Sequence, residues 1–211
     1  MDKINNIEYI LPCHFLASVE IYTLYYAGSC LWEAHENYQK RSIRNRTRFN
    51  SDQGPVGFSI PLKGGKNNQM PIKEVQISYD EDWVKSLKHL LQTNYGSSPY
   101  YEHYFEDFCV LFGSNMKFLW DLNKNTHIWI CSKLDISSPF KITEKWNKNI
   151  NLSTVQDFRT SVKSIQTTKS YPQLHGNGMG FNANLSVLDL LFNCGPESHI
   201  YLTSPYKDGY Q

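Results

Sequence analysis

Apolar and polar positions near the start of the chain predict a strand, a helix and a second strand in succession. The segment Glu8–Leu11 predicts the first strand, and Pro12–His14 predicts a turn after it. Apolar side chains over Leu16–Ala27 recur too irregularly for a strand and are compatible with the buried face of an amphipathic helix. A Gly-Ser break then leads into a strand at Leu31–His35. Such a Rossmann-like unit builds a parallel sheet.

Short strands are expected in the next part of the chain, where brief apolar runs alternate with turn-forming residues. The turn signals are DQGP and KGGKNNQMP. The runs that they separate predict strands at Arg46–Asn50, Val56–Leu62 and Ile72–Ser78. Their lengths suit a hairpin or meander joined to the first sheet.

From Asp80 onward the apolar positions repeat with the period of a helix. Acidic residues near the start and apolar residues on one face predict a first helix, which Gly96 ends. Two further helices are expected at Tyr100–Leu111 and Met116–Leu134. The segment FKITEKW (140–146) is compatible with a return strand.

Polar residues dominate from Asn147 to Gly180, which predicts a mobile excursion over the surface that could act as a lid. Within and just after it, the glycine-rich HGNGMGFNAN is interpreted as a flexible substrate loop. Order returns at NLSVLDLLFNCGP, a helix that Gly195 and Pro196 end. The whole pattern predicts an α/β fold, with one domain over residues 1–211, a mixed and partly parallel sheet, and a helical middle section.

Composition supports a folded protein without a membrane span. The chain has 211 residues, of which 40% are hydrophobic and 14% aromatic, more than a disordered chain carries. No apolar run approaches the roughly 18 residues of a membrane span, and the start does not resemble a signal peptide. The five cysteines are odd in number and lack C-x-x-C spacing, which favours a reduced, cytoplasmic protein without a thiolate zinc site.

Motifs for metals and common cofactors are absent from the sequence. It contains no G-x-G-x-x-G, Walker loop or G-x-S-x-G, so no cofactor is predicted. Five histidines show no ligand spacing such as H-E-x-x-H, and they are His89, His103, His127, His175 and His199. No metal site is predicted.

A basic run is the most distinctive local feature. Lys40, Arg41, Arg44, Arg46 and Arg48 place five cations within nine positions, although the formal net charge of the chain is only +1. On a strand, Arg44, Arg46 and Arg48 would share one face, with Lys40 and Arg41 at its edge. Guanidinium groups can each hold an oxyanion through two hydrogen bonds, which suits a diphosphate or a phosphopantetheine arm.

Two other interpretations of the basic run are open. It can be a solvated edge strand whose charges prevent association between sheets. Nucleic acid is disfavoured, because a nucleic-acid binder usually carries a strongly basic total, whereas this chain has a net charge of +1. Asn45, within the run, completes the candidate substrate-binding residues there.

Acid–base groups follow the first two predicted strands, where parallel sheets usually collect ligands. Glu36 is a candidate general base, with His14 or His35 holding the opposite proton. The alternative for Glu36 is a surface ion pair with Lys40. Cys13 is either a nucleophile activated by the following helix or a small buried residue. His14 is equally compatible with a turn residue bonded to backbone.

The late helix carries two polar residues on one side, Asp189 and Asn193, spaced one turn apart. Polar groups buried in an otherwise apolar helix need partners, and the arginines of the basic strand are suitable ones. We therefore expect Asp189 to orient an arginine rather than to act directly in catalysis.

HENYQKRSIRNRTRF and NLSVLDLLFNCGP together resemble the two signature blocks of the WbqC-like family. ILPCHFLASVEIY and NYGSSPYYEHY are similar to further blocks, so the resemblance runs from about Glu8 to Gly195. The chain departs from the family pattern at Ala17, at Glu20 with Ile21, and at Asn37. The resemblance implies a cytoplasmic role in bacterial surface-polysaccharide (O-antigen or capsule) synthesis.

Two functions follow from this combination. The first is an enzyme that transfers an acyl or aminoacyl group from an activated carrier onto an amino-sugar nucleotide. The second is a non-catalytic module that holds a sugar nucleotide or a carrier protein for another enzyme. Both need a phosphate-bearing small molecule or a carrier-linked substrate as partner.

Overall fold

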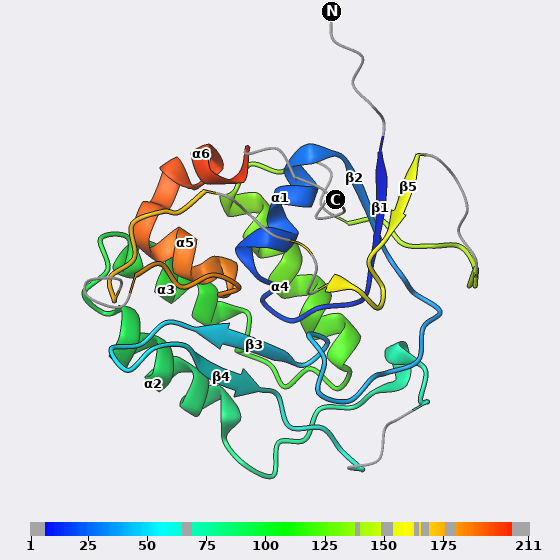
Figure 1. Cartoon of the computed structure of the whole chain (residues 1–211). Helices are drawn as coiled ribbons and strands as arrows, with labels where there is room; N and C mark the ends of the chain where they lie inside the picture. Colours follow the sequence, from blue (N-terminus) through cyan, green and yellow to red (C-terminus); the bar gives the residue numbers. More distant parts are fainter. Residues whose placement is uncertain are drawn as a thin grey trace, which may run out of the picture.

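A computed structural model describes residues 7–64, 69–137, 140–148, 154–162, 165, 169–175 and 180–203. Its central strand is β1 (Glu8–Leu11), which pairs in parallel with β2 (Ser29–Trp32) on one side and β5 (Val155–Asp157) on the other. Figure 1 shows this sheet at the upper right, with helix α1 (Val19–Ala27) beside it. The predicted strand–helix–strand unit and parallel sheet are confirmed.

Helix α1 and strand β2 differ from their predicted limits. The helix begins at Val19 rather than Leu16, because Leu16 has a φ of 42°, which a right-handed helix cannot contain. Ser18 precedes the helix in an extended conformation. Strand β2 already ends at Trp32, so the chain leaves the sheet before His35.

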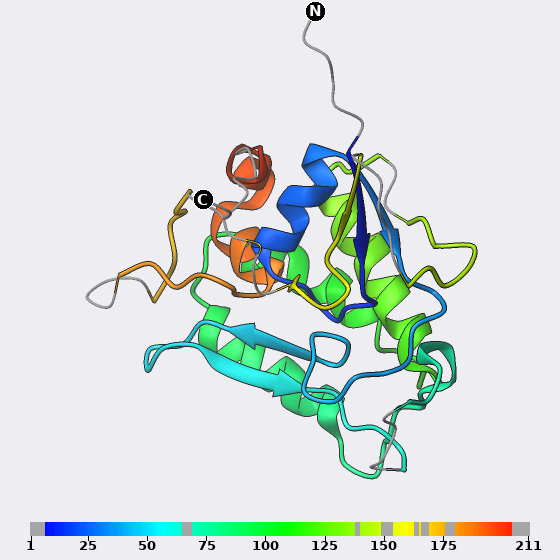
Figure 2. The same cartoon turned by 45° about the vertical axis from the view of Figure 1, so that its right-hand side comes forward.

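The strands β3 (Arg46–Phe49) and β4 (Val56–Ser59) form an antiparallel pair, as the hairpin prediction required. They make a sheet of their own rather than an extension of the first, so that part of the prediction was wrong. Figure 2 shows the pair at the lower left, apart from the parallel strands. Thr47 and Phe49 are buried, and the alternate residues Arg46 and Arg48 are exposed.

The strand expected at Ile72–Ser78 was wrong. The structure has a short 3-10 helix, η1 (Ile72–Glu74), followed by isolated bridges at Gln76 and Ile77. Gln76 bridges to Phe118 and Ile77 to Leu62, so the two residues pair with different neighbours. A segment divided between two neighbours cannot form a ladder along either.

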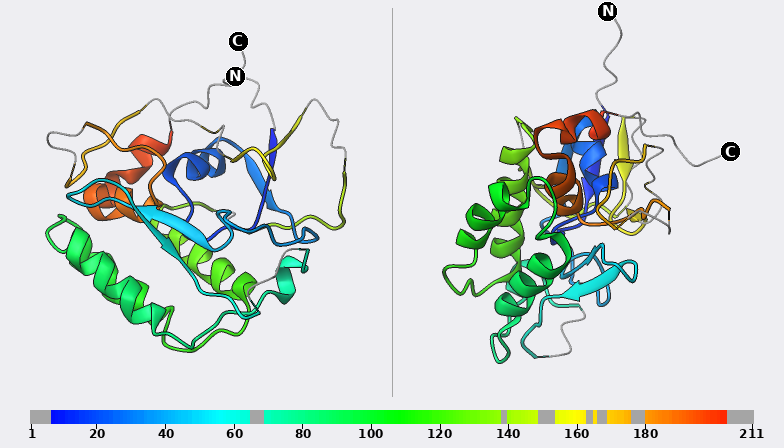
Figure 3. Two further views of the ribbon diagram at one scale, coloured as in Figure 1. Left: turned by 60° about the horizontal axis from the view of Figure 1, so that its bottom comes forward. Right: turned by 90° about the vertical axis from the view of Figure 1, so that its left-hand side faces the viewer.

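The helical middle section is confirmed, and it comprises α2 (Trp83–Tyr95), α3 (Tyr101–Val110) and α4 (Leu119–Lys133). The side chain of Asp82 caps α2 by accepting a hydrogen bond from the backbone nitrogen of Lys85 at 2.9 Å. Figure 3 shows these green helices gathered on one side of the molecule.

Helix α5 (Val187–Cys194) lies inside the molecule, and every one of its residues is buried. It contacts α1, α3 and α6 (Ser198–Leu202), and η3 (Gly195–Glu197) links it to α6. The late helix therefore ends where the sequence predicts, but a short helix follows it. No helix in the described part of the chain has the length and apolar character needed to cross a bilayer.

The excursion predicted between Asn147 and Gly180 contains a strand, β5, and is therefore not wholly irregular. Its residues 149–153, 163–164, 166–168 and 176–179 lie outside the described part, and so does the centre of the predicted glycine-rich loop. The return strand expected over 140–146 is reduced to one parallel bridge, between Ile142 and Trp32.

Candidate functional site

The carboxyl ends of the parallel strands carry two buried ion pairs. Arg159, two positions after β5, places its Nη1 2.9 Å from Oε2 of Glu33, the residue that follows β2. Arg44 binds the Glu36 carboxylate with two nitrogens, and its Nε lies 3.0 Å from Oε1. Because an unpaired buried charge is costly, each pair fixes the place of its partners.

Glu36 has the electrostatic properties of a proton acceptor near neutral pH. Burial raises the pKa of its carboxyl to about 7, although the adjacent Arg44 guanidinium acts in the opposite direction. The backbone nitrogen of Cys13 also donates to Oε1, at 3.1 Å. The carboxyl of Glu36 is therefore held in place and is half ionised close to pH 7.

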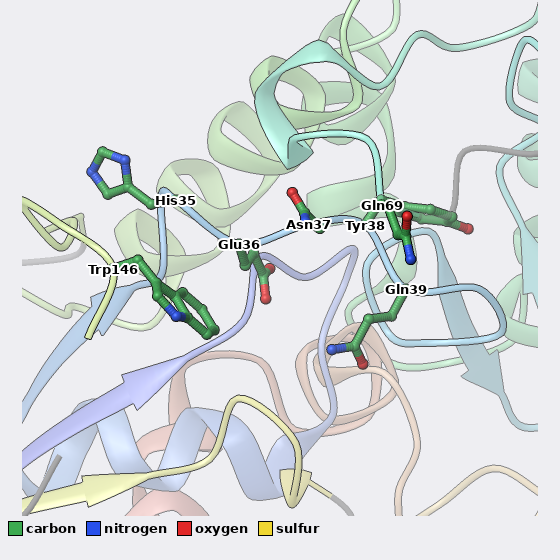
Figure 4. Close-up of a pocket in the computed structure, with 7 residues that line it drawn as sticks. All are labelled: His35, Glu36, Asn37, Tyr38, Gln39, Gln69 and Trp146. Carbon is green, nitrogen blue, oxygen red and sulfur yellow. The ribbon is translucent and has the colours of Figure 1, made fainter. Parts of the chain in front are cut away.

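Glu36 lines a pocket of about 450 Å3, which we call the Trp146 pocket. It is lined by His35, Glu36, Asn37, Tyr38, Gln39, Gln69 and Trp146. Figure 4 shows the side chains of Glu36 and Gln39 projecting to the same side of the backbone as the Trp146 ring. A carboxylate that is 3% exposed, carboxamides and an aromatic ring thus line one concavity.

Two of the groups predicted to act with Glu36 are Lys40 and His35, and neither is directed at its carboxylate in the described structure. The prediction of a surface ion pair between Glu36 and Lys40 was wrong. The carboxylate of Glu36 is buried, and Arg44 binds it with two nitrogens. His35 lines the Trp146 pocket, but its ring projects away from the carboxylate of Glu36 (Figure 4). The backbone nitrogen of His35 donates to Glu33 Oε1 at 2.9 Å. The base role of Glu36 stays a prediction.

His14 lies among aromatic rings and is not part of the Trp146 pocket. Its ring centroid is 4.6 Å from that of Trp32 and 5.4 Å from that of His127. Nδ1 lies 3.0 Å from the carbonyl oxygen of Pro12, so the interpretation as a turn residue bonded to backbone is confirmed. Burial, and secondly His127, hold the pKa of His14 well below its ordinary value. A neutral, enclosed imidazole is poorly placed to exchange protons with a substrate.

Of the two alternatives for Cys13, a nucleophile or a small buried residue, the structure supports the buried residue. It is fully buried, and burial raises the pKa of its thiol strongly. The amide nitrogen of Asn123 lies 3.1 Å from its sulfur. A thiol with a raised pKa is a weak nucleophile at neutral pH.

A second pocket, of about 770 Å3, gathers three guanidinium groups, and we call it the arginine pocket. Arg41, Arg46 and Arg48 line it. In the described part of the chain none of the three makes an ion pair. Its polar lining is completed by Ser18, Ser42, Thr47, Ser59 and Asn184.

The predicted set of arginines on one face is corrected by this arrangement. Arg44 does not share the face of Arg46 and Arg48, because its side chain is buried against Glu36. Arg41 takes its place with a left-handed backbone, at a φ of 56°. Lys40 is exposed next to Arg41 and is not among the residues that line the arginine pocket.

The polar residues of α5 have structural partners instead of arginines. The carboxylate of Asp189 accepts hydrogen bonds from the Tyr171 hydroxyl at 2.7 Å and from Gln173 Nε2 at 3.2 Å. Asp189 makes no ion pair with any described arginine, so that prediction was wrong. Burial raises the pKa of Asp189, which these hydrogen bonds oppose. Asn193 accepts from the backbone nitrogen of Leu174 at 3.1 Å.

Both polar atoms of the Asn45 side chain likewise have partners within the protein. Its Oδ1 accepts from the Tyr38 hydroxyl at 2.9 Å, and its Nδ2 donates to the carbonyl oxygen of Ile60 at 2.8 Å. The side chain therefore links the segment before β3 to the residue after β4, which gives Asn45 a structural role.

The sequence did not point to several residues of the site, which are Glu33, Gln39, Gln69, Trp146 and Arg159. Trp146 stands at the end of FKITEKW, in a polar stretch where a large aromatic residue has no core to enter. Arg159 is the chain's one arginine outside the basic run, which was the available signal for it. In the described part of the chain, no group of His, Cys, Asp or Glu side chains is arranged to hold a metal ion.

Comparisons with known proteins agree with the resemblance in the sequence. The model of the WbqC-like protein family matches residues 24–164 and 149–201. The chain is also similar to the uncharacterized protein Rv1507c of Mycobacterium tuberculosis, at 26% identity over 78% of this chain and 83% of that protein. No solved structure matches the chain. Because the matched residues make up most of its length, the chain belongs to the WbqC-like protein family.

Proposed function

We propose that this protein is an enzyme of bacterial surface-polysaccharide synthesis that acylates an amino sugar. It transfers an acyl or aminoacyl group from an activated carrier onto the amino group of an amino-sugar nucleotide. The reaction belongs to the cytoplasm, and the five free cysteines support that location because such thiols stay reduced there. The family resemblance supports the glycan context.

The segment 35–48 carries the proposal, because it lines both pockets. Its first part lines the Trp146 pocket, and its later part lines the arginine pocket. The ion pair between Glu36 and Arg44 joins the two linings, since Ile43 and Arg46 on either side of Arg44 face the arginine pocket. A proton acceptor and an anion site are therefore built from one continuous stretch.

The arginine pocket suits the phosphates of a sugar nucleotide or of a carrier. Guanidinium groups bind phosphate oxygens through paired, charge-assisted hydrogen bonds. Three guanidiniums without acidic partners among the described residues leave net positive charge in the pocket. A diphosphate carries compensating negative charge, so its binding needs no change in the protein's own ion pairs.

Glu36 supplies the acid–base step. The acceptor nitrogen attacks the carbonyl carbon of the donor, so a carbon–nitrogen bond forms and the bond from the carbonyl carbon to the carrier's sulfur or oxygen breaks. Glu36 takes the proton that the nitrogen loses, and the departing carrier atom takes a proton from solvent. Arg44 is a positioning residue, because it holds the carboxylate through two nitrogens.

The test is a turnover assay with defined acceptors and donors. UDP-glucosamine is incubated with acyl-coenzyme A, acyl carrier protein or aminoacyl-tRNA, and mass spectrometry detects the N-acylated sugar. We expect product with one donor class, and loss of product in Glu36→Gln. The control is Asp107→Asn, which removes a carboxylate from the exposed ion pair with Lys133 and should leave turnover unchanged.

A non-catalytic module is the second candidate. This candidate is favoured because both carboxylate oxygens of Glu36 already accept hydrogen bonds, from Arg44 and from the backbone nitrogen of Cys13. On this second candidate function, the Glu36 carboxylate braces the turn after β1 and takes no proton. Tight binding of a sugar nucleotide with no product from any donor, and with unchanged binding in Glu36→Gln, would establish the module and reject the enzyme.

A further inference from the structure

Trp146 is exposed where the other tryptophans are not. It is 49% exposed, whereas Trp32, Trp83, Trp120 and Trp129 are each 8% exposed or less. A large aromatic ring left half exposed at the wall of a pocket offers an apolar surface on which a ligand can pack.

The ring is held in place before any ligand arrives. The guanidinium of Arg159 lies over it, 4.2 Å from its centroid, and Arg159 is not among the residues that line the pocket. Arg159 Nη2 also donates to the carbonyl oxygen of Asn147 at 2.8 Å. Because Glu33 and Asp157 bind the same guanidinium, the two strands β2 and β5 fix the position of Trp146.

Free carboxamides face the same concavity. The side-chain amides of Gln39 and Gln69 line the pocket, and within the described part of the chain neither makes a hydrogen bond. Gln69 has a left-handed backbone, at a φ of 73°, which a non-glycine residue adopts only when its surroundings impose it. Each carboxamide can donate and accept at once, as a sugar hydroxyl does.

We propose that the Trp146 pocket binds the hexosamine ring of the acceptor. The inference rests on the proposed function and assigns the sugar to this pocket and the phosphates to the arginine pocket. One apolar face of the sugar ring packs on the indole of Trp146, while its hydroxyls exchange hydrogen bonds with Gln39 and Gln69. The amino group of the sugar then lies on the side of the pocket that Glu36 lines.

Fluorescence quenching tests the placement directly. Acrylamide reaches exposed indoles, so in this protein quenching reports mainly on Trp146. We expect glucosamine and UDP-glucosamine to protect the fluorescence, and UDP alone to leave it quenched. Protection by UDP but not by glucosamine would put a nucleobase on the ring and overturn the inference, as would an absence of protection by all three probes.

Variants of the ring separate its stacking role from a structural one. Trp146→Leu should weaken binding of UDP-glucosamine, measured by calorimetry, about tenfold or more relative to UDP. Trp146→Phe keeps an aromatic surface and should retain most of the affinity. Val110→Ala is the control, since Val110 is 74% exposed on α3 and lines neither pocket. Equal affinity for UDP-glucosamine in Trp146→Leu and the unmodified protein would overturn the inference.

Failure of this inference and failure of the proposed function give different results. If UDP-glucosamine protects Trp146 but no donor yields product, the sugar site stands and the transferase proposal fails. If turnover depends on Glu36 while Trp146 remains accessible to acrylamide, the transferase proposal stands and the sugar binds elsewhere.

Discussion

Glu36 combines an ion pair with Arg44 and a pKa that is raised to about 7. The ion pair alone would lower the pKa, so burial is the larger effect. A carboxylate in this condition accepts a proton readily at neutral pH and is already oriented by its partner.

Turnover should therefore depend on pH through Glu36. As pH falls below about 7 the carboxyl becomes protonated and cannot accept the proton of the acceptor amine, so kcat/KM should fall about tenfold per pH unit. The profile of kcat/KM against pH measures this. A midpoint near pH 4.5, the ordinary range for Glu, would contradict the assignment.

The raised pKa of Glu36 should also make the unfolding free energy depend on pH. The folded state keeps a proton on Glu36 that the unfolded state releases, because the folded pKa of about 7 lies above the ordinary value of 4.5. Between these pH values the unfolding free energy should decrease as pH rises, and it should level off above pH 7. Urea unfolding of Glu36→Gln, compared with the unmodified protein, should lack that slope.

Arg48 offers a matching test of the arginine pocket. Arg48→Ser should weaken binding of inorganic pyrophosphate several-fold, by about 1 kcal/mol or more, and reduce its dependence on salt, because one charge-assisted contact is lost. Calorimetry at two ionic strengths measures both effects. Lys85→Ser, which removes an exposed cation on α2, is the control, and equal losses in the two variants would mean that only the overall charge of the protein matters.

At the scale of elements, the end of α5 depends on one glycine. Gly195 has a φ of 52°, and a Cβ at this position would lie 2.4 Å from the ring of Tyr100. Gly195→Ala should therefore lower the unfolding free energy by at least about 1 kcal/mol, through both the left-handed backbone and the ring contact.

Urea unfolding measures this effect, and Gly57→Ala in β4 is the matched control. A Cβ at Gly57 meets no atom within 4 Å, so that variant should be close to neutral. If both variants unfold at the same urea concentration as the unmodified protein, the contact between Gly195 and Tyr100 is not as described.

Another element-scale feature is the strap, which we define as residues 169–175 and 180–184. Asp189 and Asn193 of α5 hold it through Tyr171, Gln173 and the backbone of Leu174. Asn184, at its far end, lines the arginine pocket. The strap therefore connects the interior helix to the proposed anion site.

Tyr171→Phe should loosen this strap without unfolding the protein. The variant removes a donor from the buried carboxylate of Asp189, which costs about 1–3 kcal/mol locally. Hydrogen exchange of residues 169–175 should accelerate, while exchange within α2 should stay as it was. Uniform acceleration over the whole chain would show that the contact stabilises the fold globally instead.

At the scale of the whole molecule, burial makes the five cysteines unequal. Cys13, Cys30, Cys131 and Cys194 are buried, and Cys109 alone is partly exposed. A disulfide reagent such as DTNB should modify one thiol quickly in the native protein and all five after denaturation. Cys109→Ser should abolish the fast reaction, whereas rapid modification of more than one thiol would contradict the packing of the core.

The sequence predicts the elements whose signals are local. Helix α2 has an acidic cap just before it and an apolar face along it. Helix α5 ends at Gly195, and a glycine is a common helix-ending signal in a sequence. In contrast, β5 has the sequence Val-Gln-Asp within a polar stretch, and only backbone pairing with β1 makes it a strand. No pattern within three residues announces such pairing.

The sequence predicted several residues of the candidate site but not how their side chains are arranged. The positions of Glu36, Arg46 and Arg48 at pockets follow from their places at the ends and faces of strands. The direction of the His14 side chain and the partner of Arg44 depend on packing against distant segments. The sequence could not indicate them, because a turn leaves its side chains free to point either way.

The strand order of the parallel sheet affects how the protein folds during translation. β1 is the middle strand, but its neighbour β5 is translated much later. The ion-pair partner of Glu33 is Arg159, which lies 126 positions further along the chain. Until Arg159 emerges, the nascent chain keeps an open strand edge and an uncompensated carboxylate. We therefore expect the sheet to close only late in synthesis.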